Sequence, residues 1–149
     1  MNKYVIVSFL QKDFLQNFLQ TDWPLHVTIV RPFFADKSAE DIMRALTMVC
    51  SESKPIHTSG KSREMFGPHN DIPVTELENV PALQELHDQI LAALGAWVEM
   101  GVPQYTNYRP HVTDQTTGSV PMGEAIMINS ISLVAMDDKE RRVVGTVRF

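Results

Sequence analysis

The sequence predicts an α+β domain, because strand-like and helical segments are interleaved along it without regular βαβ alternation. Roughly seven runs rich in β-branched and aromatic residues indicate strands, and three segments carry apolar residues at helical spacing. The chain has 149 residues, of which 44% are apolar and 21% are charged. This length supports one hydrophobic core but not two, so we expect residues 1–149 to form a single domain.

The predicted strands are short and are bounded by turn residues. They cover Lys3–Leu10, Leu25–Phe34, Lys54–Thr58, Ile72–Leu77 and Pro110–Thr116, followed by a hairpin of Ala125–Met136 and Arg141–Phe149. Pro32 cannot donate a hydrogen bond to a neighbouring strand, which predicts a bulge or an edge position there. The polar segment Ser59–Asp71 is rich in turn residues, and we expect a loop or a loose hairpin.

The three predicted helices are Gln11–Thr21, Ala39–Cys50 and Ala82–Met100. In the first, apolar residues such as Phe14 and Phe18 recur at helical spacing. The second follows Ser38, whose hydroxyl can cap a helix. The third is the strongest, since Pro81 suits a first helical turn and Gly101 suits the residue after the last.

Charge and composition exclude several classes of protein. The 18 acidic residues exceed the 13 basic ones, giving a formal net charge of −5, so extended binding to duplex nucleic acid is not expected. No apolar run approaches the length of a transmembrane span, and the start of the chain lacks a secretory signal. Cys50 is the single cysteine, which fits a reducing cytoplasm. We expect a cytoplasmic protein with a small nucleotide or an RNA end as its partner; a monomer is favoured, although the sequence leaves the oligomeric state open.

One tripeptide occurs twice. His26-Val27-Thr28 and His111-Val112-Thr113 stand 85 positions apart, each at the start of a predicted strand and each closely preceded by a proline. Residues two apart on a strand point to the same face, about 7 Å from one another, so each copy presents an imidazole beside a hydroxyl.

Two such copies facing one another would suit phosphoryl transfer. One neutral imidazole can take a proton from the attacking oxygen, while one imidazolium gives a proton to the leaving oxygen. Histidine serves both roles because its ordinary pKa of about 6.5 lies near working pH. The hydroxyls of Thr28 and Thr113 can hold the non-bridging oxygens. The candidate catalytic residues are therefore His26, Thr28, His111 and Thr113.

With its two motifs, its size and its order of strands and helices, the chain resembles the two-histidine (2H) phosphoesterase superfamily, which includes 2'-5' RNA ligase-like proteins and RNA 2',3'-cyclic phosphodiesterases. The family pattern, His-x-Thr/Ser-x with apolar x, is met fully by residues 26–29. The second copy departs at Asp114, which should point away from the site by strand parity. The segment from Phe66 to Val74 also resembles the loop and strand between the family's motifs.

The resemblance implies a two-lobed fold in which each lobe is a small antiparallel sheet backed by helices. A pseudo-twofold relates the lobes, and both motifs line a central cleft. It further implies metal-independent cleavage of a 2',3'-cyclic or small 2'-5' phosphodiester without a cofactor, with His111 as base and His26 as acid. The residues alone do not assign these two roles. The alternatives are a 2'-5' RNA ligase, a phosphodiesterase for 2'-5' oligoadenylates or cyclic oligonucleotides, and a non-catalytic module that binds nucleotides or RNA ends.

Four further residues are candidates for substrate binding. Arg109 shares the strand parity of His111 and could bind phosphate, whereas Arg31 would need a bulge to reach the same face as His26. Phe66 and Tyr108 could stack on a base, although either could equally belong to the core.

No metal site is predicted. Zinc sites usually need three or four His, Cys or carboxylate ligands, and here Cys50 stands alone while His57, His69 and His87 lack ligand-like spacing. We expect His87 to pack on its helix, and His57 and His69 to be solvated.

Overall fold

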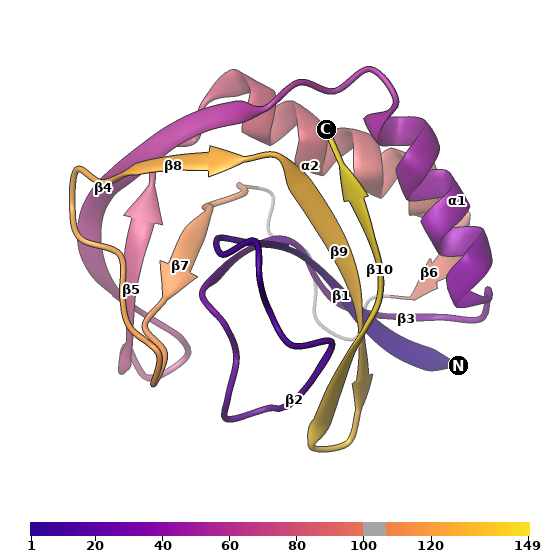
Figure 1. The fold of residues 1–149 in the computed structure, drawn as a ribbon, viewed down its shortest axis with the longest axis horizontal. Coiled ribbons are helices and arrows are strands. Elements are labelled where there is room, and N and C mark those ends of the chain that lie inside the picture. The colour runs from indigo at the N-terminus through magenta and orange to yellow at the C-terminus, as the bar shows by residue number, and fades with distance from the viewer. Residues whose placement is uncertain (100–106) are drawn as a thin grey trace.

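The structure, a computed structural model, describes residues 1–99 and 107–149 and confirms the α+β class. The strands are β1 Asn2–Phe9, β2 Asn17–Leu19, β3 His26–Ala35, β4 Ile56–Phe66, β5 Ile72–Leu77, β6 Val98–Glu99, β7 His111–Thr113, β8 Ala125–Ile128, β9 Ser130–Asp137 and β10 Glu140–Arg148. The helices are α1 Ala39–Cys50 and α2 Pro81–Leu94, followed by a 3-10 turn at Gly95–Trp97. In Figure 1 both helices lie along the top and right, and the segment carrying β2 lies at the lower middle.

The strands form one antiparallel sheet in the order β2-β10-β9-β1-β3-β7-β5-β4-β8, with β6 beside β3. The pairing of β3 with β7 joins the two halves of this sheet, and its one registered residue pair is Val27 with Val112. Helix α1 packs against β10, α2 packs against β3, and the two helices pack against each other. The central residue of each repeated tripeptide therefore lies where the two half-sheets meet.

The sheet has a core face and a motif face. The core face carries Val27 and Val112, which are fully buried with apolar side chains of α1 and α2 such as Leu46 and Ile90. The motif face is the one that carries His26, Thr28, His111 and Thr113; side chains alternate along a strand, so it is opposite the core face. Next to His26, a second apolar cluster covers the motif face of the half-sheet formed by β2, β10, β9, β1 and β3. Its buried residues are Val5, Val7, Phe9, Phe18, Val134 and Val143.

Several predicted features are confirmed. The register between β1 and β3 shifts around Arg31 and Pro32, so the proline lies in a bulge of a strand that is paired on both sides. Ser38 caps α1, where its Oγ accepts a hydrogen bond of 3.1 Å from the Asp41 amide. Helix α2 begins at Pro81.

The predicted helix at Gln11–Thr21 is wrong. Its residues form turns and the short strand β2, which pairs with β10 from Asn17 opposite Arg142 to Leu19 opposite Glu140. The helical spacing of Phe14 and Phe18 arises because both rings pack on Phe9, at centroid distances of 4.2 Å and 6.2 Å. Tertiary packing therefore overrides the local periodicity.

Two other boundaries differ from the prediction. The strand predicted at Lys54–Thr58 extends to Phe66 as β4. Of the loop or loose hairpin expected at Ser59–Asp71, the hairpin is confirmed: β4 pairs with β5, with one register shift between Gly60 and Ser62. The helix predicted at Ala82–Met100 ends at Leu94, where the Gly95 amide donates a hydrogen bond to the Leu91 carbonyl and caps the helix. The chain then forms β6, which pairs with β3. Met100 and Gly101 lie outside the described residues.

The predicted strand Ala125–Met136 is two strands. It is interrupted at Asn129, and β8 pairs with β4 while β9 pairs with β1 and β10, so one segment serves both half-sheets. The turn at residues 137–139 between β9 and β10 is confirmed. In the parts of the chain that are described, no helix has the length and apolar character needed to cross a bilayer.

Candidate active site

The two tripeptides lie side by side on adjacent antiparallel strands. With Val27 opposite Val112, the register sets His26 beside Thr113 and Thr28 beside His111. The two histidines are then diagonal neighbours, for which Cβ atoms are typically about 7–8 Å apart. All four side chains are half-buried on the motif face. The arrangement has local twofold symmetry, since each histidine lies opposite the threonine of the other copy in the strand register.

Both imidazoles are oriented in the same way. Nδ1 of His26 lies 2.8 Å from the Pro24 carbonyl oxygen, and Nδ1 of His111 lies 2.9 Å from the Arg109 carbonyl oxygen. A carbonyl oxygen only accepts, so in both rings Nδ1 carries the hydrogen. Nε2 of each ring is therefore the nitrogen that can exchange a proton with a bound molecule.

Burial lowers the pKa of both histidines. The pKa of His26 falls to about 4, mainly through loss of solvation, while the Pro24 hydrogen bond opposes the shift and the charge of His111 adds to it. Burial also lowers the pKa of His111, but the Arg109 carbonyl and the Glu76 carboxylate oppose this. Without a bound anion both rings are thus held toward the neutral form, His26 more strongly.

Aromatic side chains flank each histidine. The Trp23 ring lies 4.5 Å from that of His26, and the Phe9 ring lies 6.2 Å away. The Phe66 ring meets His111 edge-on at 4.7 Å, which brings this predicted binding residue to the second motif. Sequence reasoning missed Trp23, because it precedes its strand and belongs to neither tripeptide.

A charged pair lies beside His111. Glu76 is directly opposite His111 in the pairing of β5 with β7, and its carboxylate accepts two hydrogen bonds of 2.8 Å from Arg109. The Arg109 guanidinium also lies 4.5 Å from the Phe66 ring centre. Arg109 holds the pKa of Glu76 below its ordinary value. Sequence reasoning missed Glu76, since only the strand pairing places it here.

Arg31 is the other predicted cation. A second register shift in β3, between Thr28 and Val30, changes the alternation so that Val30 is buried and Arg31 is partly exposed. The charge of Arg31 contributes to lowering the pKa of His111. The irregular strand therefore brings Arg31 within electrostatic reach of the second motif.

A sequence profile of the 2'-5' RNA ligase superfamily matches residues 12–126, which include both tripeptides. The chain belongs to the 2'-5' RNA ligase superfamily. No curated protein sequence matches it.

Among solved structures, Escherichia coli LigT complexed with 3'-AMP superposes with a TM-score of 0.58 at 13% identity, covering 99% of this chain and 98% of LigT. TT0787 of Thermus thermophilus gives a TM-score of 0.61 at 14% identity, covering 98% of this chain and 97% of TT0787. A third structure, described as a phosphoesterase, superposes with a TM-score of 0.60 at 12% identity, covering 100% of this chain and 99% of the other.

Within this 2'-5' RNA ligase superfamily fold, Tyr108 packs between elements. Its hydroxyl donates a 2.7 Å hydrogen bond to the Thr28 carbonyl, and its ring stacks on buried His87 at 4.1 Å and 3°. Nδ1 of His87 in turn donates to the Ile29 carbonyl at 2.7 Å. Burial raises the pKa of the Tyr108 hydroxyl. Tyr108 therefore fixes the segment before β7, which carries His111, against β3, which carries His26. This structural role differs from the base stacking predicted for Tyr108.

Asp114, the departure from the superfamily pattern, is engaged away from the histidines. Its carboxylate accepts hydrogen bonds of 2.7 Å and 2.6 Å from Arg63 on β4, which also donates to Thr75. This pairing holds the pKa of Asp114 below its ordinary value. The acidic residue therefore replaces an apolar contact by an ion pair between β4 and the end of β7.

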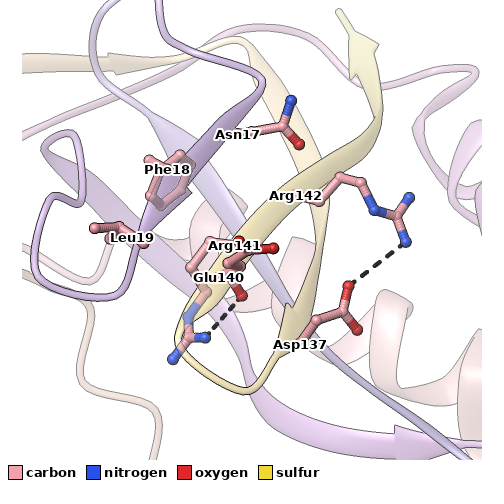
Figure 2. Close-up of a pocket in the computed structure, with 7 residues that line it drawn as sticks. All are labelled: Asn17, Phe18, Leu19, Asp137, Glu140, Arg141 and Arg142. Carbon is pink, nitrogen blue, oxygen red and sulfur yellow. Dashed lines mark hydrogen bonds and ion pairs between the residues drawn. The ribbon is translucent and has the colours of Figure 1, made fainter.

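Residues of the described ranges also line cavities that the motif residues do not reach, of which we consider two. One has a volume of about 400 Å³ and lies beside the β9–β10 turn. Figure 2 shows the residues that line it, namely Asn17, Phe18, Leu19, Asp137, Glu140, Arg141 and Arg142. Its charges compensate one another: Arg142 lies 3.8 Å from the Asp137 carboxylate, and Arg141 donates to the Asp138 and Glu140 carbonyls. A cavity of about 170 Å³ lies next to Phe9. Among the described residues, no three His, Cys, Asp or Glu side chains are grouped as metal ligands.

Proposed function

We propose that the protein is a phosphodiesterase that hydrolyses a 2',3'-cyclic phosphate, or a related small 2'-5' phosphodiester, by acid–base catalysis from His26 and His111 without a metal ion. One observation carries the proposal. Both Nδ1 atoms are committed to backbone carbonyls on adjacent strands, so two Nε2 atoms and two threonine hydroxyls are available on one face.

The superfamily and the structural neighbours support a phosphoesterase. LigT structures are described as complexes with 3'-AMP, phosphate, ATP and NADP+, which are small nucleotides or a phosphate. Ligands of this size suit a site in which two imidazoles and two hydroxyls can surround one phosphoryl group. Glu76 and Arg109 then fix the electrostatic environment of one imidazole.

The hydrolysis balances with one base and one acid. A water oxygen attacks phosphorus as the base takes one of its protons, and the bond from phosphorus to O3' breaks as the acid protonates O3'. The product carries a 2'-phosphate and a free 3'-hydroxyl. Thr28 and Thr113 would donate hydrogen bonds to the non-bridging oxygens, where charge develops in the transition state.

The electrostatics favour His26 as the base and His111 as the acid, the reverse of the order that the family resemblance implies. A pKa of about 4 keeps His26 neutral at pH 7, which a proton acceptor needs. Burial lowers the pKa of His111, Glu76 opposes this lowering, and a bound phosphate would raise the pKa from its lowered value. His111 can therefore enter the reaction protonated.

The experiment is product analysis with the four 2',3'-cyclic mononucleotides and a 2'-5' dinucleotide, with and without chelator. We expect His26→Ala and His111→Ala each to lose about 10²–10⁴-fold in kcat. His69→Ala is the matched control, because His69 is an exposed histidine in the turn between β4 and β5. Turnover that survives in both motif variants contradicts the proposed catalytic roles, and loss of turnover with chelator contradicts the metal-independent mechanism.

Further arms separate the alternatives. Joining of RNA ends without hydrolysis favours a ligase, and wild-type binding of nucleotides without turnover favours a binding module. A substrate whose 3'-bridging oxygen is replaced by sulfur has a leaving group that needs little protonation. It should restore turnover to His111→Ala but not to His26→Ala, and the opposite pattern reverses the assignment of acid and base.

A further inference from the structure

His87 is a buried histidine that the proposed mechanism does not use. Helix α2 packs against β3, and its buried side chains are Leu83, Leu86, His87, Ile90 and Leu94. In this helix, every residue of which is described, His87 is the polar member of an apolar face. A leucine would fill the position without the cost of taking an imidazole out of water. The reason for a histidine here lies in the strand that α2 covers.

An extra residue in β3 leaves a carbonyl that needs a donor. The register between β1 and β3 passes over Ile29, which is therefore the extra residue of a bulge. On the other edge of β3, the described strands have registered partners at Val27 and again only from Phe34 onward. Ile29 is completely buried, and a buried carbonyl without a donor is unfavourable. Nδ1 of His87 donates to this carbonyl at 2.7 Å and so replaces the hydrogen bond that the bulge removes from the sheet.

The contact of His87 extends to the second motif through Tyr108. The Tyr108 ring stacks on that of His87 at 4.1 Å and 3°, and its hydroxyl donates to the Thr28 carbonyl at 2.7 Å. The next residue is Arg109, whose carbonyl oxygen accepts the hydrogen bond from Nδ1 of His111. The stacked pair therefore holds the backbone of the first motif and directly precedes the residue that orients the second histidine.

The bulge also decides on which face of the sheet Arg31 lies. In a regular strand Thr28 and Arg31 would point to opposite faces, because side chains alternate with a period of two. The extra residue changes this alternation, so Arg31 is partly exposed like Thr28, whereas Val30 is buried. Burial lowers the pKa of His111, and the charge of Arg31 adds to this lowering. The place of a cation near the second motif thus depends on the bulge.

We propose that His87 is a positioning residue for the reaction. It holds the bulge at Ile29 through its hydrogen bond, and it holds Tyr108 through ring stacking. The bulge in turn sets Thr28 and Arg31 on the face of the sheet where the phosphoryl group would bind. Within the described residues, no hydrogen bond or ring contact joins His87 to either catalytic histidine, so it acts through these neighbours. The inference rests on the proposed function and adds to it a residue outside both tripeptides.

The test uses two substitutions that each keep one of the two contacts. In His87→Asn the side-chain amide nitrogen is bonded to Cγ, as Nδ1 is, so the donor to the Ile29 carbonyl is kept and the ring is lost. In His87→Phe the ring that stacks on Tyr108 is kept and the donor is lost. Ile90→Val is the matched control, since it shortens a completely buried side chain on the same face of α2.

The first readout is hydrolysis of 2',3'-cyclic UMP. We expect His87→Phe to lower kcat/KM by about 10- to 100-fold, because a displacement of about 1 Å at the site has an effect of this order. A smaller folded fraction lowers the apparent kcat at an unchanged KM, so the expected rise in KM identifies a displaced site. His87→Asn should recover most of the loss, and Ile90→Val should leave KM unchanged.

Two kinetic outcomes overturn the inference. One is a His87→Asn variant that is no more active than His87→Phe, and the other is a rise in KM in Ile90→Val that equals the rise in His87→Phe. If His87→Phe does not fold, Tyr108→Phe is the second variant, since it keeps the stacked ring and removes the hydroxyl that bonds the Thr28 carbonyl. It should raise KM in the same way, and an unchanged KM contradicts the inference.

The pKa of His111 in an NMR titration tests the positioning without turnover. This pKa is lowered by burial and further by the charge of Arg31, so it should rise in His87→Phe, where the bulge no longer holds Arg31 in place. The wild type and His87→Asn should titrate alike. The same His111 pKa in all three proteins overturns the inference while leaving the phosphodiesterase in place. A wild type that hydrolyses no substrate overturns the proposed function instead, and the titration then still decides whether His87 positions the site.

Discussion

The pKa of His26 makes a quantitative prediction about stability. In the folded protein this pKa is lowered from 6.5 to about 4, so the unfolded chain takes up a proton at His26 before the folded protein does. Folding stability is therefore lost as the pH falls from about 6.5 toward 4. Linkage between these two pKa values gives a loss of about 2 kcal/mol between pH 7.5 and pH 5, and about 3 kcal/mol in full.

The assay is urea unfolding at pH 7.5, 6.0 and 5.0 for the wild type and for His26→Asn. Asparagine stays neutral and its amide can still donate to the Pro24 carbonyl. The free energy of unfolding of the wild type should fall about 2 kcal/mol more than that of the variant, because the other titrating groups are common to both. His69→Asn, an exposed site, should follow the wild type. If the wild type and His26→Asn lose stability in parallel, His26 is not held neutral by burial and the reasoning fails.

Three further predictions concern the packing and the electrostatics around the site. Tyr108→Phe should lower the free energy of unfolding by about 1 kcal/mol, because the Thr28 carbonyl loses its hydroxyl partner; an unchanged urea midpoint would contradict that bond. Leu46→Ala should cost about 2–5 kcal/mol in the same assay, since the side chain is fully buried, and a cost below about 1 kcal/mol would mean that α1 is loosely packed. Glu76→Gln should lower the pKa of His111 in an NMR titration, because it removes the nearby negative charge; a rise would reverse the inferred role of Glu76.

The sequence was sufficient for the parts of the fold whose signals are local. The strand that carries His26, the cap at Ser38 and the bulge at Pro32 follow from residue chemistry within a few positions. The segment Gln11–Thr21 was mispredicted because its apolar spacing serves tertiary contacts with Phe9, at the end of the preceding strand, and not a helical face. The strand predicted at Lys54–Thr58 was too short, because the polar residues 59–66 form a strand through their pairing with β5 and not through their composition.

The candidate site likewise contains residues that the local sequence predicts and residues that only the fold places there. The repeated tripeptide identifies the two histidines and two threonines without any knowledge of the fold. Trp23 and Glu76 have no such signature: the first reaches His26 by a turn, and the second reaches His111 only across a strand pair. Asp114 departs from the family pattern for a reason that lies on another strand, at Arg63.

The pairing of Val27 with Val112 also fixes the register of β7 against β3. Side chains alternate strictly along a strand, so sliding β7 by one position would turn Val112 outward and drive His111 and Thr113 into the apolar interior. Both valines are completely buried, and such a slip would exchange their burial for that of two polar side chains. A misaligned chain would therefore lose stability and the catalytic arrangement together, so the packing of the two valines in the core also fixes the alignment of the two histidines.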